Sequence, residues 1–421
     1  LAIVVPLPWR LAGRAVGLSP PDGSFFDGRA AVRAWQRIEP TSCDRMVGPM
    51  TDETLATPVR LRTTLDSVPG YKPGKPAAAE GDTVVYKISS NENPYPPLPS
   101  VVEAVHEAVA TMNRYPDMAS SELTHALAQK LGVSDDEVSF GTGSVGILAA
   151  LIAITCEPGD EVVYAWRSFE AYPISVGLAG ALGVQVPNLP DGSHDLDAMA
   201  RAVTDRTRVI LLCTPNNPTG PSLRDDAVRE FLNRVPSHVV VVVDEAYWEF
   251  QRAEGLADGI ELYRDHPNVV SLRTFSKAHG LAGLRVGYTV AQQEVTQYLR
   301  QSAPAFSVTE VAQLAAIASL TNIDQVEERV QRVVDERERV LRGLDDLGWQ
   351  YPPTQANFVW LPLGEHSEAF SQLCDQHALS VRRFGAEGVR VSFGEPEANT
   401  RFLELCAAFP HPSTMPLPGQ P

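Results

Sequence analysis

The sequence predicts an α/β protein with a large, mostly parallel sheet and a second, smaller α+β domain. Between residues 84 and 274, short apolar segments alternate with stretches of helical periodicity, and several of these segments are almost continuous runs of Val, Ile and Leu. Such strands are typical of parallel sheets that helices cover on both faces. From about residue 309 the pattern changes to a long charged helix and short apolar strands, which is typical of an α+β unit.

The first elements are a strand at 84–89, a helix from Pro99 to about Met112, and a helix at 120–132 that begins with Ser-x-Glu and stops at a glycine. A strand EVSF (137–140), a Gly-rich turn and a helix over 146–155 follow. The remaining strands of the large sheet are expected at 161–165, 184–188, 208–213, 238–246 and 268–274. The second unit is expected to contain a helix over 324–348 and strands at 358–363 and 388–394.

The ends of the chain differ from this regular middle. Residues 1 to about 70 show no sustained period, and Met50 begins MTDETLATPVRLRTTL, which is typical of a natural amino terminus. The opening LAIVVPLPWR is too short and lacks the charged region of a signal peptide. We expect the following division: 1–55 disordered or a non-native extension, 56–115 an arm and part of the small domain, 116–308 the large domain, 309–410 the small domain, and 411–421 a flexible tail.

Composition limits the classes of function. The chain has 35 Lys and Arg against 52 Asp and Glu, a formal net charge of −17, which argues against a nucleic acid or an anionic membrane as partner. The five cysteines are scattered, with no C-x-x-C pair and no clustered histidines, so neither a disulfide framework nor a metal site is expected. A reducing, cytoplasmic location follows from this pattern. No apolar run reaches the ~20 residues that cross a bilayer.

Two loops at the predicted carboxyl ends of strands are rich in turn residues. FGTGSVGIL (140–148) leads from a strand into a helix near Ser144, whose free backbone N–H groups would suit a phosphate, although an ordinary glycine turn explains the motif equally well. CTPNNPTG (213–220) is a turn by its own chemistry, but its two amide side chains could also donate hydrogen bonds to a ligand.

Two further loops carry charged groups. VVVVVDEAYWEF (239–250) ends a buried strand in Asp244–Glu245, which is costly unless the charges are paired. A structural salt bridge could pair these charges. Alternatively, Asp244 faces a cationic nitrogen, with Tyr247 supplying a hydroxyl. RTFSKAHGLAGLRVGY (273–288) places Lys277 in apolar surroundings, where an amine loses its proton readily and becomes a nucleophile for carbonyl groups. Ser276 and Arg285 of this loop could hold a phosphate.

Taken together, these groups fit one cofactor. A lysine for an imine, an acid for a pyridinium nitrogen, a hydroxyl and an amide for a phenolate oxygen, and a Gly-Ser turn with Ser and Arg for a phosphate describe pyridoxal 5′-phosphate.

The motifs SSNENPYPP, NRYPD, TPNNPTG, DEAYWEF and TFSKAHGLAGLRVGY resemble those of the fold-type-I pyridoxal-phosphate aminotransferases. Within that family the chain is similar to the histidinol-phosphate aminotransferase branch, and most similar there to the aromatic amino acid aminotransferases. The resemblance covers roughly residues 55–410. It implies a fold-type-I transferase, a homodimer with shared active sites, and small amino acid and 2-oxo acid substrates.

By this resemblance, Lys277 would bond covalently to the cofactor and then carry a proton, and Asp244 would pair with the pyridine nitrogen. Asn217 and Tyr247 would hydrogen-bond the 3′-oxygen, and the ring of Phe169 would stack on the cofactor. The phosphate would be held by Ser144, the backbone of Val145, Ser276, Arg285 and, from the partner subunit, Tyr115.

On the substrate side, Arg390 in GVRVSFG matches the arginine that grips an acid group. Arg382 matches a second family arginine, with Arg383 beside it as the open alternative. Tyr71 and Asn93 would line the pocket.

One stretch departs from the histidinol-phosphate enzymes, which usually carry GSDE or GADE after the Gly-x-Gly turn, where this chain has GSVGI. That form, with WRSFE and TQANFVWLPLG, is similar to the aromatic aminotransferases. The expected function is reversible transfer of the amino group of an L-aromatic amino acid to 2-oxoglutarate in amino-acid biosynthesis. The alternative is a histidinol-phosphate aminotransferase of histidine biosynthesis.

Overall fold

A computed structural model describes residues 61–71 and 84–410 of the chain. The predictions of a disordered or non-native segment at 1–55 and a flexible tail at 411–421 lie outside the described residues. In the part that is described, no helix is long and apolar enough to cross a membrane, and no three His, Cys, Asp or Glu residues are grouped to hold a metal ion.

The large sheet has seven strands in the order β2-β8-β7-β6-β5-β3-β4. All neighbouring pairs are parallel except those made by β8, which runs antiparallel to both β2 and β7. The predicted mostly parallel sheet is therefore confirmed. The strands are β2 (Val138–Thr142), β3 (Glu161–Trp166), β4 (Leu182–Pro187), β5 (Thr207–Cys213), β6 (Val240–Asp244), β7 (Val269–Thr274) and β8 (Val286–Val290).

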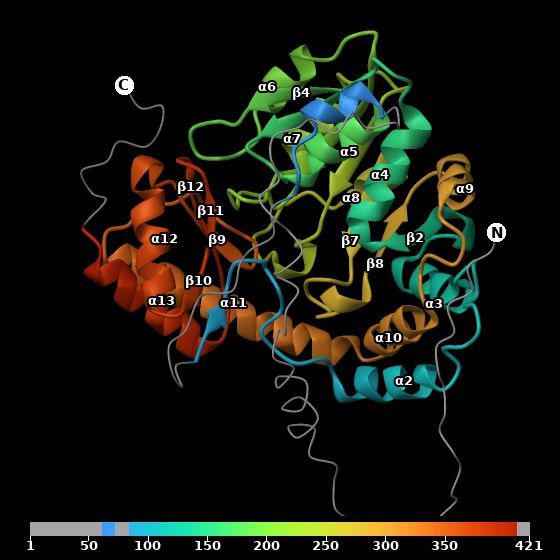
Figure 1. Cartoon of the computed structure of the whole chain (residues 1–421). Coiled ribbons are helices and arrows are strands. Elements are labelled where there is room, and N and C mark those ends of the chain that lie inside the picture. Colours follow the sequence, from blue (N-terminus) through green and yellow to red (C-terminus); the bar gives the residue numbers. More distant parts are fainter. Residues whose placement is uncertain (1–60, 72–83, 411–421) are drawn as a thin grey trace, which may run out of the picture. The chain divides into compact units, whose positions relative to one another are not determined.

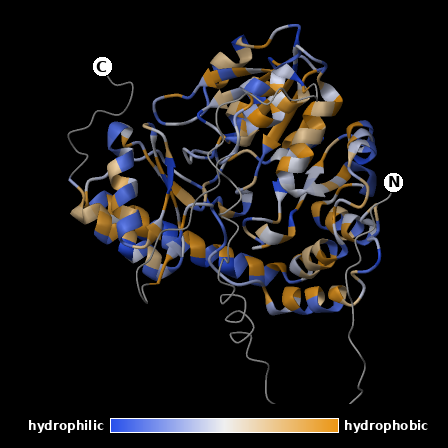
Figure 2. Ribbon diagram, in the orientation of Figure 1, coloured by the Kyte–Doolittle hydropathy of each residue, from blue (hydrophilic) through white to orange (hydrophobic). Residues whose placement is uncertain are grey.

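Helices cover both faces of this sheet (Figure 1). Two separate clusters of buried apolar side chains fill the space between helices and sheet, one on each face. One face carries α4 (Gly143–Thr155), α5 (Ala171–Ala179) and α9 (Gln293–Ser302). The other carries α3 (Ser121–Leu131), α6 (Leu196–Arg201), α7 (Asp225–Leu232) and α8 (Gly259–Asp265). Figure 2 shows the strands between these layers as mainly hydrophobic. This explains why the central strands lack the alternation of a one-sided sheet.

A second, antiparallel sheet has the order β11-β12-β9. The strands β1 and β10 form a short parallel pair, which joins an early segment of the chain to a late one. The elements of this region are β1 (Tyr86–Lys87), β9 (Phe358–Leu361), α12 (Ser367–Gln376), β10 (Leu379–Ser380), β11 (Arg382–Phe384), β12 (Gly388–Ser392) and α13 (Pro396–Ala408).

The helix α11 (Ile323–Asp346) contacts α13 near one end and α10 (Glu310–Thr321) near the other (Figure 1). Its buried residues are mainly valines three, four or seven positions apart, as in an amphipathic helix. The helix α10 packs against α3 and against α2 (Pro99–Val109). The predicted boundary at residues 308 and 309 thus falls just before a helix that contacts elements from the first third of the chain, and the domain division stays a prediction.

Short 3-10 helices complete the described elements: η1 (Thr63–Ser67), η2 (Asp135–Glu137), η3 (Trp248–Phe250), η4 (Ala282–Leu284) and η5 (Gly364–His366).

Candidate active site

The strand register brings the four chemistry-bearing loops together. Cys213 at the end of β5 lies opposite Asp244 at the end of β6. Thr274 at the end of β7 lies opposite Gly287 of β8, which in turn lies opposite Gly141 near the end of β2. Because β8 is antiparallel to both neighbours, β2 and β7 end at the same edge of the sheet. The loops after β2, β5, β6 and β7 therefore meet there, where parallel sheets place their ligands.

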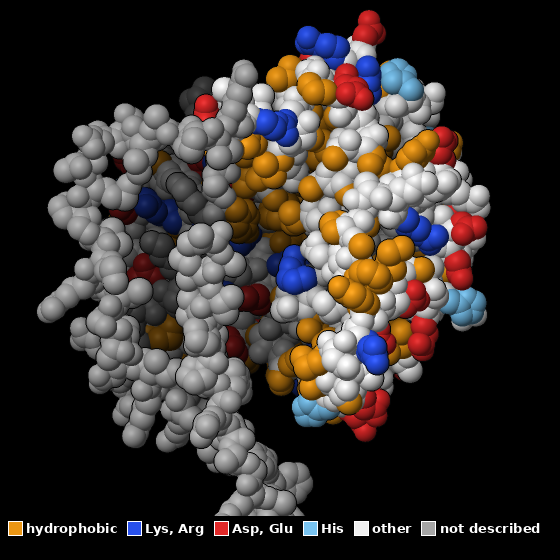
Figure 3. Space-filling view, turned by 45° about the vertical axis from the view of Figure 1, so that its right-hand side comes forward, with side chains coloured by type: hydrophobic (Ala, Val, Ile, Leu, Met, Phe, Trp, Pro, Cys, Tyr) orange, Lys and Arg blue, Asp and Glu red, His pale blue; other side chains and the backbone are white. Residues whose placement is uncertain are grey.

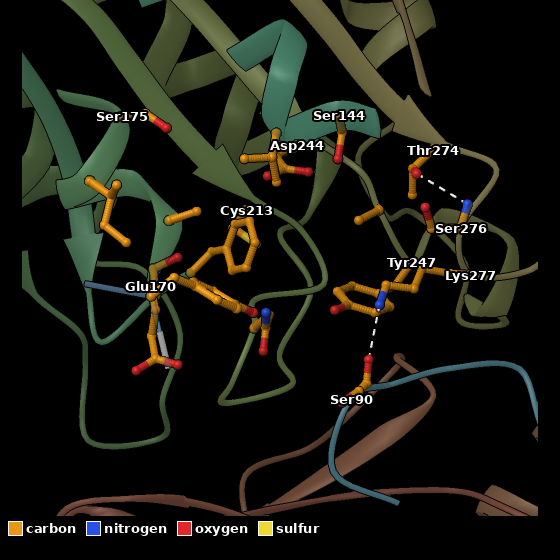
Figure 4. A pocket seen from close by; sticks show the side chains of 18 of the residues that line it. Ser90, Ser144, Glu170, Ser175, Cys213, Asp244, Tyr247, Thr274, Ser276 and Lys277 are labelled. Atoms are coloured by element: carbon orange, nitrogen blue, oxygen red, sulfur yellow. Dashed lines mark hydrogen bonds between the residues drawn. The ribbon is translucent and has the colours of Figure 1, made fainter. Parts of the chain in front are cut away.

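A cavity of about 490 Å³ opens at this edge. It also receives side chains from the three-stranded sheet and from the segment before α2. Twelve of the predicted site residues line it: Tyr71, Ser144, Val145, Phe169, Asn217, Asp244, Tyr247, Ser276, Lys277, Arg285, Arg382 and Arg390. Figure 4 shows Lys277 and Tyr247 side by side at one end of this cavity.

Two predicted residues lie elsewhere. Asn93, which the sequence predicts in the pocket lining, does not line the cavity, because its amide donates hydrogen bonds to the backbone oxygens of Lys277 (3.4 Å) and Ala278 (3.0 Å). Asn93 thus stabilises the backbone of the loop that carries Lys277. Tyr115 is 80% exposed and stacks on Phe306 with ring centroids 4.4 Å apart, outside the cavity of its own chain.

Lys277 presents an amine that is easily deprotonated. Its Nζ donates a hydrogen bond to the backbone oxygen of Ser90 at 3.1 Å and lies 5.8 Å from the ring centre of Tyr247 (Figure 4). Burial, assisted by the positive charge of Arg390, lowers the pKa of this amine to about 7. A neutral amine is a nucleophile and a proton acceptor, as the apolar sequence around it predicts.

The neighbouring acids Asp244 and Glu245 have different surroundings and different partners. Glu245 forms a buried ion pair with Arg273 at 3.1 Å and accepts a hydrogen bond from Ser271. Asp244 faces the cavity, where Tyr172 donates a hydrogen bond to its Oδ2 at 2.8 Å. Its Oδ1 is buried and has no hydrogen-bond partner among the described residues. The structural salt bridge therefore applies to Glu245, whereas Asp244 faces the cavity, because successive side chains of a strand point to opposite faces. A cationic nitrogen as the partner of Asp244 stays a prediction.

The unpartnered Oδ1 of Asp244 is the clearest indication that this cavity binds a ligand. Burial raises the pKa of the Asp244 carboxyl to about 6, although the bond from Tyr172 opposes this shift. A cationic N–H from a ligand would satisfy Oδ1 and stabilise the charged form.

The hydroxyl of Tyr247 is oriented by a residue that the sequence did not single out. The amide of Asn91 donates a hydrogen bond to this oxygen at 2.9 Å, and Ser392 in turn donates to Asn91 at 2.7 Å. Burial raises the pKa of the Tyr247 hydroxyl, which therefore keeps its proton for donation.

The start of α4 has the features of an anion site. Ser144 stands in the first turn of this helix, and no side chain in the described part of the chain caps its free N–H groups. The hydroxyl of Ser276 accepts a hydrogen bond from Arg285 at 3.4 Å. No carboxylate of the described residues pairs with Arg285. A side chain at Gly287 would approach the backbone nitrogen of Ser144 to 2.5 Å, so only glycine allows this close packing.

Two arginines reach the cavity from adjacent strands of the second sheet. Arg390 of β12 is buried and donates hydrogen bonds to Asn217 and to the backbone oxygen of Ser89. Arg382 of β11 lines the cavity, whereas Arg383 points the other way and lies 3.5 Å from Glu368. The alternation of the strand decides between these two neighbours.

The residues that the sequence did not single out are Asn91, Tyr172 and Glu170, which pairs with Arg382 at 2.6 Å. Asn91 lies in SSNENPYPP, Glu170 lies in WRSFE and Tyr172 follows two positions later, but no local signal distinguishes them. Their partners lie between 72 and 212 positions away, so only the fold brings them together.

Comparison with known proteins agrees with this geometry. Residues 83–405 match the family model of class I and II aminotransferases. The chain is 55% identical over 353 residues to an aromatic amino acid aminotransferase of Streptomyces coelicolor, covering 84% of this chain and 98% of the relative. A protein of the same name from Thermobifida fusca is 51% identical over 353 residues, again 84% and 98% of the two chains.

Among solved structures, the histidinol-phosphate aminotransferase of Sinorhizobium meliloti, determined in complex with pyridoxal-5′-phosphate, is similar with a TM-score of 0.73 and 30% identity, over 83% of this chain and 96% of that one. The fold and the family model agree over most of the chain. The chain therefore belongs to the class I and II aminotransferases.

Proposed function

We propose that the chain is an aromatic amino acid aminotransferase, which uses pyridoxal 5′-phosphate to exchange amino groups between an L-aromatic amino acid and 2-oxoglutarate, reversibly. The observation that carries the reaction class is the unpartnered Oδ1 of Asp244 in the same cavity as the Lys277 amine. The substrate class is supported by the names of relatives that are about half identical to this chain over nearly their whole length.

The residues of the cavity fit this cofactor. Ser144, Ser276 and Arg285, with the N–H groups at the start of α4, would hold the phosphate. Asp244 would pair with the ring nitrogen, Tyr247 and Asn217 would hydrogen-bond the ring oxygen, and Phe169 would lie against the ring face. When bound, pyridoxal phosphate supplies an aldehyde that bonds to amines and a protonated ring that withdraws electrons from the substrate Cα.

The chain itself supplies the proton transfer. The low pKa of Lys277 leaves about half of its amine neutral at pH 7, so it can accept the proton of the substrate Cα and return it. The backbone oxygen of Ser90 orients this amine through the hydrogen bond at 3.1 Å. Asp244 stays charged once a cationic group satisfies its free oxygen, and Tyr172 fixes its position.

The guanidinium of Arg390 would bind the substrate α-carboxylate. Its Nε is buried and has no hydrogen-bond partner in the described structure, so a donor remains available. Planar, bidentate recognition of a carboxylate is the ordinary use of a buried arginine that lacks an acidic partner.

We further expect a cytoplasmic homodimer that acts in amino-acid biosynthesis. Tyr115 would reach the phosphate in the partner's site, and its exposure together with its stacking on Phe306 supports an interface at this position. Tyr71 would close over the substrate, since it lines the cavity although 56% of it is exposed.

The experiment is a half-reaction scan that follows the cofactor absorbance after mixing with phenylalanine, tyrosine, tryptophan and histidinol phosphate. Fast conversion by the aromatic amino acids supports the proposal. Because a solved neighbour is named a histidinol-phosphate aminotransferase, that activity is the alternative, and a higher kcat/KM for imidazole-acetol phosphate than for phenylpyruvate would favour it. Lys277→Ala is the control, since it removes the amine and should show no conversion with any of them.

A further inference from the structure

Two arginines stand opposite each other on neighbouring strands of the second sheet. Arg382 of β11 and Arg390 of β12 are register partners in an antiparallel pair, and both line the cavity. The ring of Phe384 lies near both, with guanidinium carbons 5.4 Å and 5.7 Å from its centre. Like charges in this arrangement repel, so at least one of them needs compensation.

Only one of the two has an acidic partner. The Nη2 of Arg382 lies 2.6 Å from Oε2 of Glu170, and the two side chains are 12% and 29% exposed. Arg390 hydrogen-bonds neutral oxygens, those of Asn217 and Ser89, and no carboxylate of the described residues lies within ion-pair distance. The cavity therefore offers one available guanidinium and one that is already neutralised.

Glu170 stands just before α5 and shares the helix face that lines the cavity. Ile174 and Leu178, four and eight positions later, also line it and present apolar surface beside the ion pair. Figure 4 shows Glu170 across the cavity from Lys277, where the side chain of a substrate held by its α-carbon near the lysine would extend.

We propose that Glu170 is a specificity-determining residue, which neutralises Arg382 and so selects substrates with one acid group and an uncharged, apolar side chain. This inference rests on the proposed function. An aromatic side chain has no charge to offer Arg382, and an unpaired guanidinium beside it would be costly to desolvate. A substrate with a second carboxylate or a phosphate must displace Glu170 before it can use Arg382. The second substrate, 2-oxoglutarate, has two carboxylates, so it is accepted only when one of them replaces Glu170 as the partner of Arg382.

The test compares Glu170→Gln with the wild-type holoenzyme in half-reactions with phenylalanine, glutamate and histidinol phosphate. The change keeps the shape of the side chain and releases the charge of Arg382. The ratio of kcat/KM for glutamate, which has a second carboxylate, to that for phenylalanine should rise roughly tenfold or more, as expected when a charged hydrogen bond becomes available. Histidinol phosphate, whose single phosphate carries up to two charges, should gain in the same direction. Arg382→Gln leaves the carboxylate of Glu170 unpaired, so the same ratio should fall.

Glu387→Gln is the matched control. It breaks the neighbouring ion pair between Glu387 and Arg167, neither of which lines the cavity, so the ratio should stay at the wild-type value. Calorimetric binding of the unreactive acids glutarate and 3-phenylpropanoate gives a second readout. Glu170→Gln should strengthen the binding of glutarate and leave that of 3-phenylpropanoate unchanged.

The inference is overturned if Glu170→Gln and Arg382→Gln shift both readouts no more than Glu387→Gln, or if both shift them in the same direction. That result, with a wild-type enzyme that converts phenylalanine, leaves the proposed function standing. A wild-type enzyme that fails to convert phenylalanine would instead remove the proposed function.

Discussion

At the scale of single residues, the site keeps charges and polar atoms in conditions that are unfavourable unless a ligand pairs with them. Asp244 is 4% exposed and has one oxygen without a partner among the described residues, and Lys277 is held where its ammonium form is disfavoured. Glu245, one position from Asp244, has a full set of partners. Unsatisfied groups of this kind cluster at functional sites because a ligand completes them.

The Asp244 carboxyl should make the stability of the apoprotein depend on pH. Its pKa rises on folding from 3.8 to about 6, so the folded state binds the proton more tightly, and stability falls as pH rises through this interval. Asp244→Asn removes this dependence. The unfolding free energy of the variant relative to wild type should increase by up to about 3 kcal/mol between pH 4 and pH 7.

Urea unfolding of both apoproteins across that range is the measurement. Other titrating groups, such as Glu249, are common to the two proteins and cancel in the difference. Parallel stability curves would show that the carboxyl is not destabilised by burial. In the holoenzyme, wild type should be more stable than Asp244→Asn at pH 7, because the variant loses the charge that pairs with the ring nitrogen.

The Lys277 amine should react at lower pH than an ordinary lysine. Its pKa is lowered to about 7, so the rate at which apoprotein regains its cofactor should rise with pH up to about 7 and level off above it. Arg390→Gln removes the second largest cause of the shift and should move this midpoint upward. Stopped-flow absorbance gives both profiles, and a rate that still climbs steeply between pH 8 and pH 9 would contradict the assignment.

At the scale of elements, the proposed anion site depends on the contact between β8 and the start of α4. Gly287 lies where β8 passes the first turn of α4, and an added Cβ would come within 2.5 Å of the Ser144 nitrogen and 2.9 Å of the Gly143 carbonyl carbon. These are backbone atoms, which cannot move aside without shifting the helix.

Gly287→Ala should therefore displace the first turn of α4 and weaken cofactor binding by about tenfold, with a loss of roughly 1–3 kcal/mol in stability. Gly283→Ala is the control, because an added Cβ there meets no atom within 4 Å. Titration of apoprotein with pyridoxal phosphate, followed by tryptophan fluorescence, and thermal unfolding measure the two effects. Equal behaviour of the two variants would argue against this contact.

At the scale of the whole molecule, the active-site cavity is built from parts of the chain that are far apart in sequence. The large sheet supplies the amine, the acid and the anion site, and the second sheet supplies the two arginines. On the face shown in Figure 3, basic and acidic side chains of the described residues are interspersed.

The proposed sharing of active sites between two subunits predicts complementation between two defective variants. Lys277→Ala should be inactive, and Tyr115→Ala should bind the cofactor weakly. If Tyr115 acts on the partner's site, a mixed dimer contains one site with both defects and one intact site. Random mixing should then restore about a quarter of the wild-type sites. Activity at limiting cofactor after subunit exchange is the measurement, and the lack of any gain over the separate variants would place Tyr115 in its own chain's site or outside both.

Most strands of the large sheet and the residues that end them could be predicted from the sequence. The apolar runs before Cys213, Asp244 and Thr274 locate buried strands, and the polar residues after them follow from the turn chemistry. The strand β8 was missed, because it directly follows the loop of Lys277 and its short sequence VGYTV has no turn signal before it. The strand β1 is shorter than predicted, covering only Tyr86–Lys87.

Local sequence determined which groups this protein brings to its chemistry: an amine in apolar surroundings, an acid at the end of a valine strand, and a Gly-Ser helix start. These follow from patterns a few residues long. Only the tertiary structure decided which of two neighbours faces the cavity, as for Asp244 over Glu245 and Arg382 over Arg383. It alone pairs Glu170 with Arg382 across 212 positions, because electrostatic contacts between distant segments depend on strand direction and register, which no short stretch of sequence encodes.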